Sequence, residues 1–291
     1  MFKGSLVALI TPFRDGAVDE TAFQEHVAWQ IGQGTRGLVP IGTTGECPAL
    51  EEEEQERLIA LTVEVAKGRA PVIAGTGFNS TAHTIHATKA AKKAGADAAL
   101  VVCPYYNKPT QEGLYQHFKA VHDAVDMPIV IYNIPGRSAV DMSNATMARL
   151  AKLPNIVGVK DATNDLARPL KMRVEIEGEF CLLSGEDATA VAYLAQGGDG
   201  VISVTANVAP GLCSEMHEAW QKGDIATVRQ INERLIPLHD ALFAETSPGP
   251  VKYAASLLGR CTAEVRQPLW QILPETQEKV RKAMRSAGLI N

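Results

Sequence analysis

The stretch Asn155–Thr163, NIVGVKDAT, places a lysine at the end of an apolar, β-branched run. Such a run is typical of a strand buried on both faces. Lysine is rarely fully buried there, because its ammonium group loses hydration. Desolvation lowers the pKa of a lysine from about 10.4 and leaves a neutral amine, which can add to a ketone and expel water. Lys160 is therefore a candidate Schiff-base nucleophile.

A structural role for this lysine is the alternative. The side chain of Lys160 could extend to solvent, or it could pair with Asp161 or Glu186. Imine formation needs neighbouring groups that move protons, so hydroxyl-bearing side chains nearby would favour the catalytic interpretation.

The rest of the chain indicates how such a lysine would be positioned. Eight short apolar runs recur, separated by polar turns and helical patterns: Leu6–Ile10, Leu38–Ile41, Val72–Gly75, Ala99–Cys103, Ile129–Asn133, Ile156–Lys160, Cys181–Gly185 and Val201–Val204. Strands that alternate with helices predict a parallel sheet with right-handed crossovers. Eight such units favour an α/β fold closed into a (β/α)8 TIM barrel, with a doubly wound open sheet as the alternative.

Helical segments are expected at Glu51–Gly68, Thr81–Gly95 and Asp187–Gly197, each with a polar start and a glycine at its end. The strand signal disappears after residue 217. We therefore expect a catalytic barrel over residues 1–222 and a C-terminal helical region over residues 223–291. Ser247–Pro250 interrupts this region, which is predicted to pack on the barrel.

Polar residues follow the predicted strands, where a barrel places its chemistry. They occur at Gly42–Glu46, Gly75–Gly77, Pro104–Asn107, Tyr132–Asn133 with Arg137, Lys160, Ser184–Glu186, and Ser203 with Thr205. Hydroxyl groups, an arginine and a lysine would thus meet at one mouth.

Composition excludes several classes of protein. The 291 residues are 46% hydrophobic and 21% charged, with a net charge of −5 and no basic cluster, so nucleic acid is not expected as a partner. The apolar runs are too short for a signal peptide core or a membrane span. Five scattered cysteines without a CxxC pair indicate reduced thiols in a cytoplasmic protein.

Other motifs carry less weight. His83 and His86 lie three residues apart, but no third ligand supports a metal site. The acidic run Glu51–Glu54 is explained by the helix dipole. Gly75–Ser80 is glycine-rich but lacks the spacing of a nucleotide fingerprint. Neither a metal nor a cofactor is expected.

Several motifs together resemble the 4-hydroxy-tetrahydrodipicolinate synthase (dihydrodipicolinate synthase) family. They are GTTGE at 42–46, PVIAGTG at 71–77, PYYNKPTQEGLYQHFKA at 104–120, IYNIPGR at 131–137, GVKDAT, LLSGEDA, and GGDGVISVTANVAP at 197–210. The resemblance covers essentially the whole chain. It implies a (β/α)8 lyase, usually a homotetramer built as a dimer of dimers. The family condenses pyruvate with L-aspartate 4-semialdehyde in the diaminopimelate route to lysine.

The resemblance also implies roles for particular residues. Lys160 matches the Schiff-base lysine, and Tyr132, Thr43 and Tyr106 match the proton relay, with Tyr106 reaching in from a neighbouring subunit. The substrate-binding positions are Thr44 for pyruvate's carboxylate, Arg137 for the semialdehyde's carboxylate, and the backbones of Gly185 and Ile202 beside the imine.

Related aldolases on the same fold remain alternatives. Sialic-acid lyases and 2-keto-3-deoxy sugar acid aldolases share the lysine and the tyrosine, but Thr44 and Arg137 favour the semialdehyde enzyme. A barrel that only binds a keto acid, without catalysis, is a further alternative.

Feedback inhibition by lysine is not expected to be strong. Regulated members of the family bind lysine in a cleft at the dimer interface, and Asn79 and Tyr105 match two of the ligands. The positions that depart from that pattern are Cys47, Pro48, Glu52, Gln55 and His83.

Overall fold

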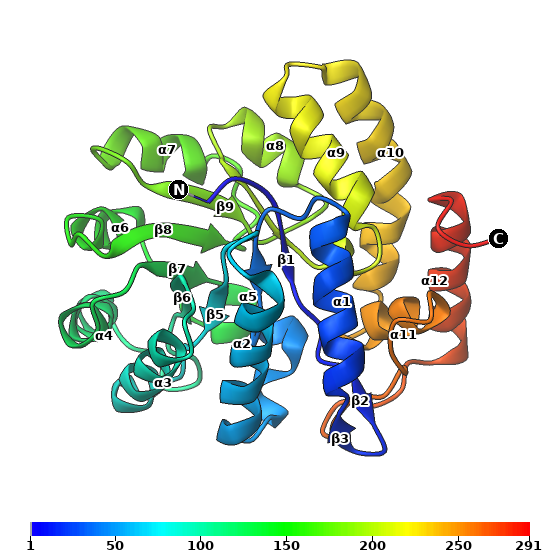
Figure 1. Cartoon of the computed structure of the whole chain (residues 1–291). Helices are drawn as coiled ribbons and strands as arrows, with labels where there is room; N and C mark the ends of the chain where they lie inside the picture. Colours follow the sequence, from blue (N-terminus) through cyan, green and yellow to red (C-terminus); the bar gives the residue numbers. More distant parts are fainter. Residues whose placement is uncertain (1) are drawn as a thin grey trace. The chain divides into compact units, whose positions relative to one another are not determined.

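Figure 1 shows the computed structural model of the chain, which describes residues 2–291. The contacts divide the chain into two compact units. The first comprises residues 2–3 and 71–202, and the second comprises residues 4–70 and 203–291. None of the helices in the described residues is long and apolar enough to cross a membrane.

The first unit holds a parallel sheet whose strands follow chain order. They are β5 (Ile73–Gly75), β6 (Ala98–Val102), β7 (Ile129–Asn133), β8 (Ile156–Asp161), β9 (Cys181–Ser184) and β10 (Gly200–Ser203), the last ending at the unit's boundary. The helices are α3 (Thr81–Lys93), α4 (Gln111–Ala124), α5 (Pro135–Ser138), α6 (Asn144–Leu150), α7 (Arg168–Glu175) and α8 (Ala190–Ala195). In Figure 1 α3, α4, α6 and α7 lie on the outer side of these strands. A core that includes Leu114, Phe118 and Ile131 fills the space between the two layers.

Three helices were predicted with defined first residues, and two of them, α3 and α8, lie in this unit. Helix α3 begins at the predicted residue, where the Ser80 hydroxyl accepts a hydrogen bond from the backbone of His83, and Gly95 follows its end with a φ of 91°. Helix α8 starts three residues later than predicted. Asp187 lies before the helix, and Thr189 stands at the cap position.

The second unit pairs β1 (Gly4–Ala8) with β4 (Leu38–Val39) in parallel, so that Val7 lies opposite Leu38. Its helices are α1 (Glu20–Gly32), α2 (Glu52–Ala66), α9 (Pro210–Gln221), α10 (Ile225–Leu242), α11 (Gly249–Leu257) and α12 (Pro274–Ser286). Three short 3₁₀ turns are η1 (Thr43–Gly45), η2 (Cys47–Ala49) and η3 (Thr205–Asn207). Helix α10 packs against α9, α11 and α12.

Local sequence explains the ends of the elements here. Glu51 and Glu54 form a capping box at the start of α2, a contact that the sequence analysis did not predict. Lys67 and Gly68 end the helix with positive φ. A small antiparallel hairpin of β2 (Phe13–Arg14) and β3 (Ala17–Val18) was not predicted. Its turn is Asp15–Gly16, with φ of 53° and 83°, the conformation that favours an Asp-Gly pair.

Taken in chain order, eight parallel strands alternate with helices, which is the order of a (β/α)8 barrel. The described residues beyond 223 contain helices α10 to α12 and no strand. The boundary between residues 222 and 223, and the packing of the C-terminal region on the barrel, stay predictions.

Candidate active site

Lys160 and Tyr132 lie at the ends of neighbouring strands in the first unit. The register of β7 and β8 places them directly opposite each other, so their side chains point to the same face. Each residue is 6% exposed, and the Lys160 Nζ lies 4.3 Å from the centroid of the Tyr132 ring. Within the described residues, no ion pair joins Lys160 to Asp161 or Glu186. The lysine is thus buried against an aromatic ring and has no carboxylate partner.

The residues next along these strands point to the opposite face and fix the strand ends. The Asn133 amide donates to Asp141 at 2.7 Å, and Asp141 also accepts from the Arg168 guanidinium at 3.0 Å. The same guanidinium lies 3.6 Å from Asp161, whose other oxygen accepts the backbone N–H of Thr163 at 3.0 Å. Burial raises the pKa of the Asp161 carboxyl, and the hydrogen bond of Thr163 and the charge of Arg168 oppose that rise.

The turn after β9 closes tightly on β8. The backbone N–H of Gly185 donates to the Asp161 carbonyl at 2.7 Å, and a Cβ at Gly185 would lie only 2.7 Å from that of Ala162. The Ser184 hydroxyl donates to the carbonyl of Glu186 and accepts its N–H. Glycine is required here because the two backbones approach closely.

Glu186 is an acidic residue that the sequence analysis placed among the polar residues after the strands and considered as a partner of Lys160, without giving it a role in catalysis. It is half-buried, and it lines a small cleft with Asp161, Ser184 and Tyr193. Burial is the largest cause that raises the pKa of its carboxyl. The charge of Asp187 adds to the rise, and the positive charges of Lys160 and Arg137 oppose it. Its place directly after a strand end was the available signal.

The remaining candidates of this unit differ in exposure. Arg137 is exposed on the short helix α5, directly after β7. Tyr106 is 89% exposed in the segment between β6 and α4, and its φ of 71° is unusual for a bulky residue. Ile202 is fully buried on β10, which pairs with β9.

Thr43 and Thr44 belong to the second unit, where they form the turn η1. Thr44 is buried and Thr43 is half-buried. The turn is closed by hydrogen bonds from the N–H of Gly45 to the Gly42 carbonyl and from the N–H of Glu46 to the Thr43 carbonyl. The structure therefore presents the two threonines from a fixed turn, and not from a strand.

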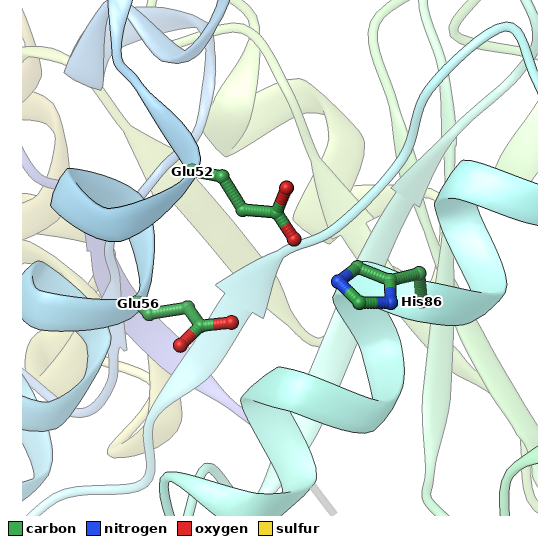
Figure 2. Close-up of side chains that lie close together, drawn as sticks. All are labelled: Glu52, Glu56 and His86. Carbon is green, nitrogen blue, oxygen red and sulfur yellow. The ribbon is translucent and has the colours of Figure 1, made fainter.

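The two histidines that the sequence analysis considered for a metal, His83 and His86, are exposed on α3. The His83 ring stacks on Phe78 with 3.8 Å between centroids. Figure 2 shows Glu52 and Glu56 one turn apart on α2, and His86 on α3, which belongs to the other unit. All three are exposed. The five cysteines, all within the described residues, form no disulfide.

Known proteins match this chain over its whole length. The profile of the Dihydrodipicolinate synthetase family matches residues 1–287. The 4-hydroxy-tetrahydrodipicolinate synthases of Rhodospirillum centenum and Parvibaculum lavamentivorans are 67% and 60% identical, each aligned over 100% of both chains.

Solved structures of dihydrodipicolinate synthases also match this chain. Dihydrodipicolinate synthase from Aquifex aeolicus is 45% identical with a TM-score of 0.97, over 99% of both chains. The Acinetobacter baumannii enzyme, crystallised with pyruvate, is 46% identical with a TM-score of 0.97, over 100% of both. These matches confirm the predicted (β/α)8 fold, and the chain belongs to the dihydrodipicolinate synthetase family.

Proposed function

We propose that this chain condenses pyruvate with L-aspartate 4-semialdehyde to give 4-hydroxy-tetrahydrodipicolinate, in the diaminopimelate route to lysine. The observation that carries the proposal is Lys160, buried at a strand end against Tyr132 and without a carboxylate partner among the described residues. The names of relatives that match the entire chain support the same reaction.

The chemistry begins at the Lys160 amine. It adds to the keto carbon of pyruvate and water leaves, so that an imine forms. Loss of a methyl proton gives an enamine, whose carbon attacks the aldehyde of the second substrate. The amino group of that substrate then displaces Lys160 as the ring closes, which returns the free lysine. The product carries all atoms of both substrates except one water.

Proton transfer in this scheme falls to three hydroxyl groups, those of Tyr132, Thr43 and Tyr106. A positioned phenol contributes roughly 10²–10⁴-fold to such a step. Tyr106 is 89% exposed in the single chain, which suits a side chain that completes the pocket of a second copy. The family resemblance implies a homotetramer, and we propose for this chain a dimer of dimers in which Tyr106 crosses the dimer interface.

Binding of the two substrates is assigned to different groups. Thr44 and the adjacent backbone amides hold the carboxylate of pyruvate, while the backbones of Gly185 and Ile202 line the imine. Arg137 holds the carboxylate of the semialdehyde. The exposed guanidinium of Arg137 forms no ion pair with another described residue, so it is available for a charge-assisted, bidentate contact. We also propose a cytoplasmic location, since the cysteines of the described residues form no disulfide.

One experiment tests the nucleophile and the reaction together. The protein is reduced with borohydride in the presence of pyruvate, and the modified peptide is identified by mass spectrometry. Steady-state assays then compare condensation with the semialdehyde against cleavage of N-acetylneuraminate and of 2-keto-3-deoxy sugar acids. We expect an adduct on Lys160 and turnover only with the semialdehyde. Pyruvate binding without an adduct, or cleavage of a sugar acid in place of condensation, would contradict the proposal.

A further inference from the structure

The second unit contains a completely buried ion pair, and one of its partners, Glu46, directly follows the turn that carries Thr43 and Thr44. The side chains of Glu46 and Lys252 are both 0% exposed, and the Lys252 Nζ lies 2.7 Å from Glu46 Oε1. Glu46 Oε2 accepts the backbone N–H of Arg266 at 2.9 Å. Both oxygens of this carboxylate are therefore held by groups more than 200 positions away in the chain.

The surroundings of the pair are equally fixed. The Lys252 Nζ lies 4.0 Å from the centroid of the Phe13 ring, and the Arg266 guanidinium lies 4.4 Å from the same ring. That guanidinium also donates to the Ala49 carbonyl at 3.0 Å and to both oxygens of Glu54. The segment that follows the turn is thus held by the same cluster.

A pair of this kind contributes little net stability. Removing two charges from water costs several kcal/mol per ion, and replacing a buried pair by apolar groups of similar volume is often neutral or stabilising. Burial lowers the pKa of Lys252, and the charge of Glu46 and its hydrogen bond oppose this shift. The stability of the fold therefore does not explain why a paired lysine is buried here. A need to fix the conformation of the neighbouring turn does explain it.

The geometry concerned is that of the turn. Glu46 follows η1 and precedes η2, and its φ of 57° is the left-handed conformation, which a residue with a side chain adopts at a cost. The Gly45 carbonyl accepts the Thr11 hydroxyl at 2.7 Å, and a Cβ at Gly45 would lie 3.2 Å from the Leu9 carbonyl. The side chain of Glu46 is the anchor that keeps this strained connection in one conformation.

We propose that Glu46 and Lys252 are positioning residues that hold Thr43 and Thr44 in the conformation that receives the carboxylate of pyruvate. The inference rests on the proposed function, in which Thr44 and the neighbouring amides bind that carboxylate. The pair does not touch substrate. Its loss loosens the turn, so it weakens pyruvate binding much more than binding of the semialdehyde, which Arg137 holds.

The test is a double variant that removes both charges together, Glu46→Gln with Lys252→Met, so that no unpaired charge is left buried. The matched control removes an exposed pair of the same unit, Glu20→Gln with Arg57→Met, whose atoms are 2.7 Å apart at the surface. We expect the KM for pyruvate to rise roughly tenfold in the buried-pair variant, with the KM for the semialdehyde within about twofold of wild type. The surface control is expected to keep both KM values.

The outcomes separate this inference from the proposed function. If wild type traps pyruvate on Lys160 and the buried-pair variant keeps the wild-type KM for pyruvate, the positioning role is wrong and the proposed function stands. Equal increases in both KM values also overturn it, because they indicate a general loss of structure. If wild type traps no pyruvate, both proposals fail together. Should the double variant not fold, Glu46→Asp decides, since it keeps both buried charges and only shortens the side chain that anchors the turn. It is expected to raise only the KM for pyruvate, by about threefold.

Discussion

Two lysines are buried among residues 2–291, one in each unit, and their surroundings differ. Lys160 and Lys252 both place the amine over an aromatic ring, 4.3 Å from Tyr132 and 4.0 Å from Phe13. Lys252 also has a carboxylate at 2.7 Å, that of Glu46, whereas no described residue forms an ion pair with Lys160. The carboxylate immobilises Lys252 and covers its amine. Burial by itself therefore does not distinguish the two lysines, and the missing counter-ion is the feature that supports Lys160 as the proposed nucleophile.

The supports of the two lysines also differ. Lys160 is aligned with Tyr132 by the register of β7 and β8, and backbone hydrogen bonds of the sheet are enough to hold it. Lys252 holds an irregular turn, where no sheet register exists, through a side chain. Side chains at strand ends are positioned by the backbone of the sheet, whereas side chains on an irregular turn depend on side-chain contacts that fix the turn.

Lys160→Ala gives the largest effect and tests the comparison directly. We expect turnover to fall by roughly three orders of magnitude or more, because the covalent route is removed. Borohydride trapping of pyruvate, followed by peptide mapping, measures the loss of the adduct. The thermal midpoint serves as the control for folding. An adduct on Lys252, in wild type or variant, would show that the ion pair does not exclude that lysine from chemistry.

Acid should weaken both units through one buried histidine in each. Burial lowers the pKa of His26, in the second unit, and of His117, in the first, from 6.5 to about 4. The unfolded chain then binds more protons than the folded one between pH 6.5 and 4, so stability is complete above pH 6.5 and falls as pH decreases towards 4. Each histidine lowers the free energy of unfolding by about 2 kcal/mol as the pH decreases from 7 to 5.

Urea unfolding of wild type, His26→Gln and His117→Gln at the two pH values measures this dependence. Each variant is expected to lose part of the pH dependence, even where its stability at pH 7 is lower. A free energy of unfolding that falls equally in all three proteins would contradict the role of His26 and His117 and assign the acid sensitivity to other titratable groups.

Arg137→Ala should affect one substrate only. Loss of a charge-assisted contact costs about 1.5–3 kcal/mol, which corresponds to a rise of roughly one to two decades in the KM for the semialdehyde. Arg149→Ala is the matched control, because Arg149 is an exposed arginine of the same unit that pairs with Glu112. Steady-state kinetics with each substrate varied in turn measure the effect. Equal rises in both KM values would mean that Arg137 supports the pocket as a whole.

Tyr106→Phe removes one hydroxyl and leaves the imine chemistry in place. We expect turnover to fall about tenfold to a hundredfold while borohydride still traps pyruvate. Mixing Tyr106→Phe subunits with Lys160→Ala subunits should restore activity in hybrids, because one pocket then holds both intact residues. Hybrids as inactive as the unmixed variants would show that each pocket is built from a single chain.

The strands were predictable because buried parallel strands are continuous apolar runs. Ile129–Asn133 is correct at both ends, and the place of Lys160 near the end of a buried strand is confirmed, although that strand extends one residue further, to Asp161. Exceptions have local causes. Strand β1 starts two residues before its apolar run, since Gly4 and Ser5 are buried without being apolar. Strand β4 ends at Val39, because the next residue, Pro40, has no N–H for a ladder.

The ion pairs and hydrogen bonds around these side chains could not be predicted from apolar patterns. Glu46 and Lys252 are 206 positions apart, and neither has a periodicity or motif that indicates the other. Asn133, Asp141 and Arg168 form a second network. Nothing in the sequence distinguishes these three residues from polar residues at the surface. Patterns of apolar residues report burial, whereas partners of charged residues depend on the assembled fold.

The smallest expected effect is that of added L-lysine. In this chain, His83 stands where the resemblance expects the glutamate that pairs with lysine's side-chain ammonium, and its ring stacks on Phe78. Gln55, at a position where a histidine is expected, donates instead to the carbonyls of Cys47 and Leu50. Each of the two side chains already has a partner within its own unit.

Weak or absent inhibition is therefore expected at millimolar lysine, since an ammonium without its carboxylate loses the contact that is worth most in a semi-buried site. Glu52 is the residue that could restore the charge, so Glu52→Gln is the informative companion variant. Steady-state assays with a lysine titration measure the effect in wild type and in this variant. Half-inhibition of wild type below about 1 mM, equivalent to roughly 4 kcal/mol of binding, would contradict the prediction. If Glu52→Gln then abolished that inhibition, the acidic partner would be assigned to α2 in place of residue 83.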